Sequence, residues 1–280
     1  MTIKIDYSRD KLFDEFSIRT LKDRYMVADE TSPQQAFARA AKVFSDDDDH
    51  AQRLYDYVSN HWFMFATPLL SNGGTERGLP ISCFLNYVDD SREGITEHYT
   101  ENAYLSSFGG GIGGSWSDIR SAGTKTSKGS ESTGVIPFMK VVDAEMLAFS
   151  QGITRRGSYA SYLHMSHPEI EEFLDIRKPT GGDTNRKCLN LHHGIVIPDK
   201  FMEIIHMATK TEGFDDSWEL IDPHSGEVKK VVSARTLWVK LLQNRMETGE
   251  PYLMFEDAVQ ADLPDFQKRK GLRVNHSNLC

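Results

Sequence analysis

A change of hydrophobic pattern near residue 66 restricts the fold of this chain more than any other feature. Between residues 8 and 66, apolar residues recur at helical spacing. From Thr67-Pro68 onward, short apolar runs rich in β-forming residues alternate with helical stretches, a pattern typical of βα units and parallel strands. The sequence therefore predicts an α/β protein with a small helical domain at residues 1–66 and a second domain at 67–280.

Two local signals belong to the helical domain. Ser32 followed by Pro33 is a good helix start, because the hydroxyl caps free amides and the proline ring fixes φ. Four aspartates, Asp46 to Asp49, separate this helix from the next one. We interpret the acidic run as a solvated loop and a helix N-terminus rather than a metal site.

The second domain contains about five strands in its main series. The candidates are residues 81–88, a short extended piece that ends at Arg120, and residues 159–165, 189–197 and 252–255. Residues 217–221 and 228–232 flank an Asp-Pro-His-Ser-Gly turn and predict a hairpin. Five main strands suit a half barrel and an open α/β sheet equally well.

Composition excludes several classes of function. A formal charge of −9 over 280 residues, without a long basic run, disfavours nucleic acid and anionic membrane surfaces as partners. The three cysteines are too few, and odd in number, for a secreted disulfide framework. The N-terminus lacks the apolar core of a signal peptide and no apolar run is long enough to span a membrane, so we expect a cytoplasmic protein.

Glycines, histidines and cysteines are the candidates for chemistry. The run Gly109 to Gly114 follows a helix rather than a strand, so a dinucleotide fingerprint is excluded, while tight packing and ligand approach stay open. His192 and His193 lie in a strand, where neighbouring side chains face opposite ways, and we expect no metal site. Cys188 precedes an apolar strand and is expected to be buried.

Several landmarks together resemble the large, catalytic subunit of class I ribonucleotide reductase. They occur in the order of that family and at close to its spacing. The landmarks are Thr67-Pro68 with Ser71, Ser82-Cys83, Gly111-Ile112-Gly113 with Ile119-Arg120, residues 134–138, Ser150-Gln151-Gly152 and Ser277-Asn278-Leu279-Cys280. The resemblance implies a short helical domain followed by the first five-stranded half of a ten-stranded α/β barrel, in which a finger loop carries a cysteine thiyl radical.

The same resemblance implies catalytic roles. Cys280 would be the thiyl that removes the 3′ hydrogen of the substrate, and Asn278 would bond the ribose hydroxyls. Cys83 would be one of two thiols that reduce the 2′ carbon and end as a disulfide. Substrate-binding positions implied by the resemblance are Thr67 and Ser82 at the phosphates, together with Gly111 and Asn278.

An allosteric site is also implied. Asp90 resembles the carboxylate that binds the ribose of a deoxynucleoside triphosphate effector, and Arg120 resembles a phosphate ligand of that effector. Lys128 stands where the family has a second arginine. The loop from Gln151 to Gly157, with Arg155 as its contact, resembles the segment that relays effector identity to the substrate base.

The implied activity is reduction of ribonucleoside diphosphates to deoxyribonucleotides for DNA synthesis. The resemblance implies no cofactor bound directly by this chain, ATP or dNTP effectors, and a radical supplied by a metal-containing small subunit. Further implied partners are thioredoxin or glutaredoxin and a second copy of the completed large subunit.

The family's catalytic glutamate, second reducing cysteine, radical-path tyrosines and shuttle cysteines would all follow residue 280, and no ATP cone precedes residue 8. We therefore expect an N-terminal part that is inactive alone and needs a C-terminal fragment. A split gene, an intein junction and a truncated sequence all fit this expectation. Its exposed apolar face and free sheet edge would favour association.

Two rival functions remain open. One is a non-catalytic dNTP-binding regulatory module that keeps Asp90 and Arg120. The other is a glycyl-radical reductase relative, which shares the barrel. The Ser82-Cys83 pair and the effector-like segment favour the class I large subunit.

Overall fold

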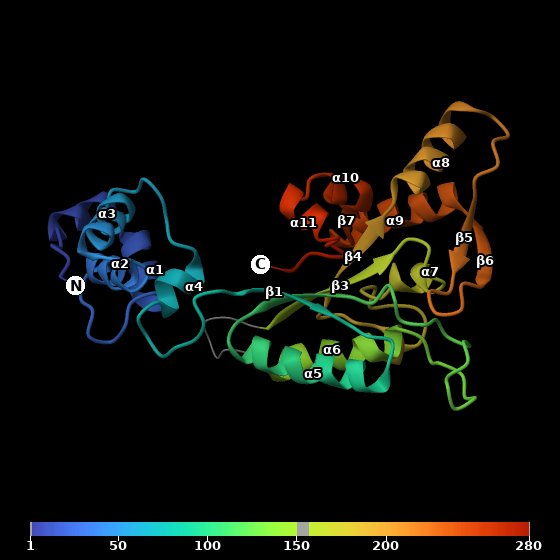
Figure 1. The fold of residues 1–280 in the computed structure, drawn as a ribbon, viewed down its shortest axis with the longest axis horizontal. Helices are drawn as coiled ribbons and strands as arrows, with labels where there is room; N and C mark the ends of the chain where they lie inside the picture. Colours follow the sequence, from blue (N-terminus) through green and yellow to red (C-terminus); the bar gives the residue numbers. More distant parts are fainter. Residues whose placement is uncertain (1, 150–156, 280) are drawn as a thin grey trace. The chain divides into compact units, whose positions relative to one another are not determined.

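The computed structural model describes residues 2–149 and 157–279. The chain divides into two compact units, Met1–Ser82 and Cys83–Cys280, and each is described by itself (Figure 1). Among the described residues, no helix has the length and apolarity that crossing a membrane requires.

The first unit is helical. Its core surrounds the fully buried Phe37 and Tyr55, which come from the two helices that pack most closely. Ser32 forms a capping box with Gln35, and Asp47 caps the next helix, which confirms both local signals read from the sequence. The elements are η1 (Tyr7–Leu12), α1 (Glu15–Arg24), α2 (Pro33–Val43), α3 (Asp48–Ser59) and α4 (Thr67–Asn72).

Thr67-Pro68 begins a further helix of this unit. Leu70 of α4 joins the core around Phe37, because α4 packs on α2. The compact unit therefore continues to Ser82, whereas the change of sequence pattern placed a domain boundary near residue 66.

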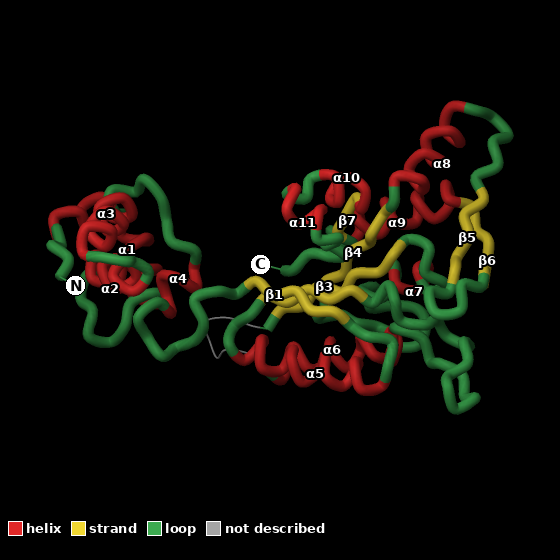
Figure 2. The backbone as a smooth tube through the Cα atoms, viewed as in Figure 1, coloured by secondary structure: helices red, strands yellow, loops and turns green. Residues whose placement is uncertain are grey.

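The second unit is built on a five-stranded, fully parallel sheet, which confirms the α/β prediction (Figure 2). Its strands, in spatial order, are β1 (Cys83–Tyr87), β2 (Gly111–Ser115), β3 (Ser158–His164), β4 (His192–Ile197) and β7 (Tyr252–Phe255). The predicted hairpin is also present, as β5 (Ser217–Ile221) paired antiparallel with β6 (Val228–Ser233).

The second strand differs from the expected one. It lies at Gly111–Ser115 and begins within the glycine run, before the stretch expected to form the strand. Two short helices after β7 were not anticipated. The helices of this unit are α5 (Arg92–Ser107), α6 (Ile136–Ala148), α7 (Ile170–Phe173), α8 (Asp199–Lys210), α9 (Ala234–Thr248), α10 (Glu256–Ala261) and α11 (Asp265–Arg269), with a 3-10 turn η2 at Thr184–Arg186.

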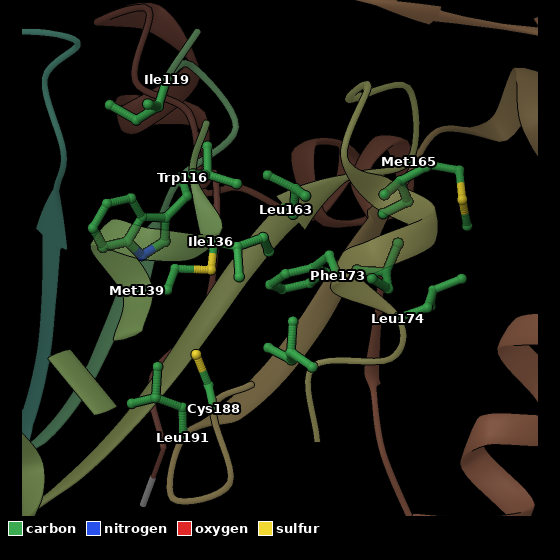
Figure 3. Packing of buried hydrophobic residues seen from close by; sticks show 14 of the residues in the cluster. Trp116, Ile119, Ile136, Met139, Leu163, Met165, Phe173, Leu174, Cys188 and Leu191 are labelled. Atoms are coloured by element: carbon green, nitrogen blue, oxygen red, sulfur yellow. The ribbon is translucent and has the colours of Figure 1, made fainter. Parts of the chain in front are cut away.

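One face of the sheet carries the main hydrophobic core. Trp116, Met139 and Leu163 are fully buried between this face and the helices that include α5 and α6. Figure 3 shows the Cys188 sulfur pointing into this cluster beside Leu191. Cys188 is fully buried, as the sequence predicted, and burial raises the pKa of its thiol to about 12.

The opposite face, called here the inner face, carries a second and smaller cluster. Tyr162, Val196 and Met254 are buried there with Ala160, and Val274 and Leu279 pack against them. Figure 1 shows the chain returning from α11 toward the sheet. Residues Val274–Leu279, called here the terminal segment, therefore lie on the inner face.

Candidate active site on the inner face of the sheet

Cys83 opens β1 and faces the inner side of the sheet. Its neighbour Phe84 packs against the main core, and Asn86 donates from Nδ2 to Asn102 Oδ1 on α5 at 2.7 Å. Because strand side chains alternate, Cys83 points the other way, and it is exposed. The backbone of Cys83 pairs in register with Gly111 of β2.

The terminal segment contacts β2 on the inner face of the sheet. His276 contacts the Gly113 carbonyl oxygen through Nε2 at 3.0 Å, and Asn278 Nδ2 lies 3.5 Å from the Gly111 carbonyl oxygen. From His276 to Asn278 the residue number rises by two, while that of the β2 partner falls by two, from Gly113 to Gly111. The segment therefore runs antiparallel to β2.

Glycine is required at two neighbouring positions of β2 for different reasons. A Cβ on Gly113 would lie 1.9 Å from the Ser277 carbonyl oxygen. A Cβ on Gly114 would lie 1.9 Å from Tyr159 Oη on the core side. The glycine run thus allows close packing on both faces of a buried strand. On the inner face, the group that packs against it is the backbone of the terminal segment.

Cys83 and Asn278 consequently meet around one residue, Gly111. Cys83 reaches it through backbone pairing, and Asn278 reaches it through its carboxamide. A thiol can give up a hydrogen atom or join a disulfide, and a carboxamide can hold hydroxyl groups. Cys280 lies outside the described residues.

Thr67 and Ser82 belong to the first unit. Thr67 begins α4, and its Oγ1 lies 3.2 Å from Tyr25 Oη. Ser82 is buried and directly precedes Cys83 in the chain.

The residues assigned to the effector site follow two adjacent strands. Asp90 comes after β1 and Arg120 comes after β2, and the carboxyl ends of parallel strands share one edge of the sheet. Arg120 Nε lies 3.0 Å and 2.9 Å from the two oxygens of the Asp90 carboxylate. The hairpin turn adds a residue that the sequence did not indicate, because His224 Nδ1 lies 3.2 Å from Asp90 Oδ2.

The loop that carries Lys128 is tied to the hairpin by one buried carboxylate. Asp222 Oδ2 accepts hydrogen bonds from the Ser121 amide at 2.7 Å, the Ser121 hydroxyl at 2.6 Å and the Thr124 hydroxyl at 2.9 Å. Burial opposes ionisation, yet the hydrogen bonds from Ser121, Ser225 and Thr124 hold the pKa of Asp222 well below its usual range. Lys128 is exposed on this loop, while Gln151 and Arg155 lie outside the described residues.

Three histidines of the sheet contact carboxylates. His164 Nε2 lies 3.4 Å from Glu256 Oε2, which comes from far along the chain. His192 and His193 both contact the carboxylate of Glu250 through Nδ1, although they are neighbours in one strand. No cluster of three or more metal-ligating side chains occurs within 2–149 and 157–279.

A cavity of about 380 Å³ lies at the carboxyl ends of β2, β3 and β4. Its lining includes Ser115, His164, Glu256, Arg273 and Asn275. The cavity is at the opposite end of these strands from Cys83, which begins β1.

Comparisons with known proteins match both units. A family model described as the all-alpha domain of ribonucleotide reductase matches residues 11–78, and one described as its barrel domain matches residues 81–280. The ribonucleoside-diphosphate reductase large subunit of Invertebrate iridescent virus 6 is 47% identical over 99% of this chain, which spans 28% of that relative. The large subunit of Invertebrate iridescent virus 3 is 42% identical over 99% of this chain, which spans 50% of it.

A solved structure is similar over the same extent. The Actinobacillus ureae class Id ribonucleotide reductase alpha subunit superposes with a TM-score of 0.77 and 29% identity, over 99% of this chain and 46% of that chain. The chain therefore spans half or less of the length of each of these three relatives.

Proposed function

Because the chain belongs to the ribonucleotide reductase large-subunit family, we propose that it contributes to the reduction of ribonucleoside diphosphates to deoxyribonucleotides. The chain supplies the all-alpha domain and the first half of the barrel. Activity then requires the remaining length of the large subunit and a small subunit that generates the radical. Thioredoxin or glutaredoxin would restore the reduced thiols after each turnover.

The observation that supports this proposal is the meeting of Cys83 and Asn278 around Gly111 on the inner face. In the proposed reaction, a thiyl at Cys280 takes the 3′ hydrogen and becomes a thiol. The 2′ hydroxyl leaves as water, and Cys83 and a second thiol supply two electrons by forming a disulfide. The 3′ hydrogen then returns to the substrate and regenerates the thiyl. Asn278 orients the ribose hydroxyls throughout, and Ser82, Thr67 and the backbone of Gly111 hold the substrate.

The test uses the chain reconstituted with the rest of the large subunit and the small subunit. Cys280→Ser should abolish 3′ hydrogen abstraction without damage to substrate, because an O–H bond is far stronger than an S–H bond. Cys83→Ser should allow abstraction, so that the substrate radical decays with release of base and phosphate. Cys188→Ser is the matched control and should affect stability more than chemistry. Equal base release from the Cys83 and Cys280 variants would overturn the assignment.

We further propose that Asp90, Arg120 and Lys128 bind the ribose and phosphates of an ATP or dNTP effector, with Gln151 and Arg155 relaying its identity. The position of Asp90 and Arg120 at one sheet edge supports this. Asp90→Ala and Arg120→Ala should weaken effector-dependent choice of substrate in the reconstituted enzyme and leave basal turnover. An unchanged effector response in both variants would remove the assignment.

A further inference from the structure

The terminal segment is held at its start by one side chain of α10. Gln260 Nε2 donates to the Val274 carbonyl oxygen at 2.6 Å, and the Val274 amide donates to Gln260 Oε1 at 3.2 Å. A single carboxamide therefore satisfies both main-chain groups of Val274, as a neighbouring strand would. The contact fixes where the segment enters the inner face.

Two side-chain contacts of Glu256 reinforce the entry point. Arg273 Nη2 lies 2.7 Å from Glu256 Oε1, and Glu256 Oε2 lies 3.4 Å from His164 Nε2 at the end of β3. The residue just before the segment is thus tied to α10 and, through α10, to the sheet. Arg273 is largely exposed, so this contact is weaker than the buried ones.

Further along, His276 fixes the segment to β2. Its side chain is 8% exposed, and its contact from Nε2 to the Gly113 carbonyl is buried. A carbonyl only accepts, so Nε2 carries the proton and donates. Burial lowers the pKa of His276 from its ordinary value, so the ring is neutral near pH 7. Ser277 then passes over Gly113 at a distance that no other residue there would permit.

We propose that Gln260 and His276 are positioning residues that set the register of the terminal segment on β2, and with it the place of Asn278 relative to Cys83. The inference rests on the proposed function. A slip of one residue in an extended chain moves each group by about 3.3 Å and turns it to the other side. Asn278 orients the ribose in the proposed reaction, and hydrogen transfer needs the reacting atoms about 3 to 3.5 Å apart, so misplacement of the segment slows the transfer.

Both contacts go to main-chain atoms, which is why they set position and not substrate choice. Gln260 bonds the amide and carbonyl of Val274, and His276 bonds the carbonyl of Gly113. Neither side chain has to touch substrate for this role. Because Asn278 lies in the same segment, loss of either contact should lower kcat and also raise KM for the ribonucleotide.

The test combines kinetics of the reconstituted enzyme with amide hydrogen exchange of the 280-residue chain. His276→Leu removes the donor to Gly113, whereas His276→Gln keeps an amide donor. Gln260→Glu removes only the donor to Val274, and Gln243→Glu on the exposed side of α9 is the matched charge control. We expect His276→Leu and Gln260→Glu to lower kcat by about 100-fold, as misplacement by about 1 Å can.

Exchange supplies the readout that is independent of activity. In both damaging variants the amides of Val274–Leu279 should exchange at least about tenfold faster, while His276→Gln and Gln243→Glu should behave as the parent chain. Unchanged exchange, or faster exchange with unchanged kcat, would overturn the positioning role. If the reconstituted enzyme with the unsubstituted chain had no activity, only the proposed function would be contradicted. The exchange rates would then show whether Gln260 and His276 hold the segment on β2.

Discussion

Glu145 is a half-buried acid whose environment favours its neutral form. Its Oε2 is buried and has no hydrogen-bond partner among the residues that the structure describes. Burial raises the pKa of Glu145 to about 7, from an ordinary value of 4.5. The folded protein therefore binds this proton more tightly, and the free energy of unfolding falls as the pH rises from about 4.5 to 7.

Glu145→Gln should remove this pH-dependent loss. Because the side chain is partly exposed, the expected gain in the free energy of unfolding is about 1 to 2 kcal/mol at pH 8, with no gain near pH 4.5. Urea unfolding at the two pH values measures it. Glu101→Gln, at an exposed carboxylate on α5, is the control, and an equal gain from both substitutions would contradict the burial argument.

The two glycines of β2 should respond differently to alanine. A Cβ at Gly114 meets Tyr159 Oη, which is fixed by His98 Nε2 at 2.8 Å and Trp116 Nε1 at 3.1 Å inside the core. Gly114→Ala is thus expected to lower the free energy of unfolding by about 3 kcal/mol.

Gly113→Ala should instead displace the terminal segment and leave the core intact. Thermal unfolding combined with exchange of Val274–Leu279 distinguishes the two effects. If Gly113→Ala proved the more destabilising substitution, the assignment of faces would be wrong.

The surroundings of a single residue could be predicted from the sequence where its neighbours along the chain determine them. Cys188 is buried as expected, since an apolar run follows it. The partner of His164 was not readable, because Glu256 comes from an element that lies far along the chain. No local sequence pattern predicts a contact between two residues so far apart in the chain.

At the scale of elements, the link between the loop of residues 121–134 and the β5–β6 hairpin depends on Asp222. Asp222→Asn replaces one acceptor oxygen with a donor group, so it cannot satisfy all of its partners. We expect a loss of about 2 to 4 kcal/mol in the free energy of unfolding, with faster amide exchange in the loop. Asp215→Asn, at an exposed aspartate before β5, should cost far less, and similar losses from both would refute the anchoring role.

Element prediction succeeded where periodicity was clear and failed at β2. The parallel strands β3, β4 and β7 follow from apolar runs. The strand Gly111–Ser115 does not, because glycine has no side chain to show a period and normally weakens a strand. Only the close approach of Tyr159 and Ser277 explains glycine there.

At the scale of the whole molecule, the inner face and the sheet edges are incompletely covered. Leu85 and Tyr87 on β1 are 55% and 54% exposed, and no described strand pairs with the outer edge of β1 or β7. Such edges and faces promote association. We predict that the 280-residue chain forms concentration-dependent oligomers when purified alone.

Size-exclusion chromatography with light scattering measures this association. Leu85→Lys should reduce it, whereas Leu242→Lys on α9 should not. A polypeptide that covers the rest of the large-subunit relatives should convert the oligomers to a defined complex. A monodisperse monomer with no affinity for that polypeptide would contradict the prediction.

The bond from His276 to Gly113 also has a consequence for the order of folding. It closes a loop of 163 residues, which is entropically expensive while the intervening chain is disordered. Once β2, β3, β4 and β7 have paired, most of that chain is already compact and the remaining cost is small. The terminal segment should therefore dock last, onto a finished sheet. Asn278 would then reach Gly111 only after the framework of the sheet has formed.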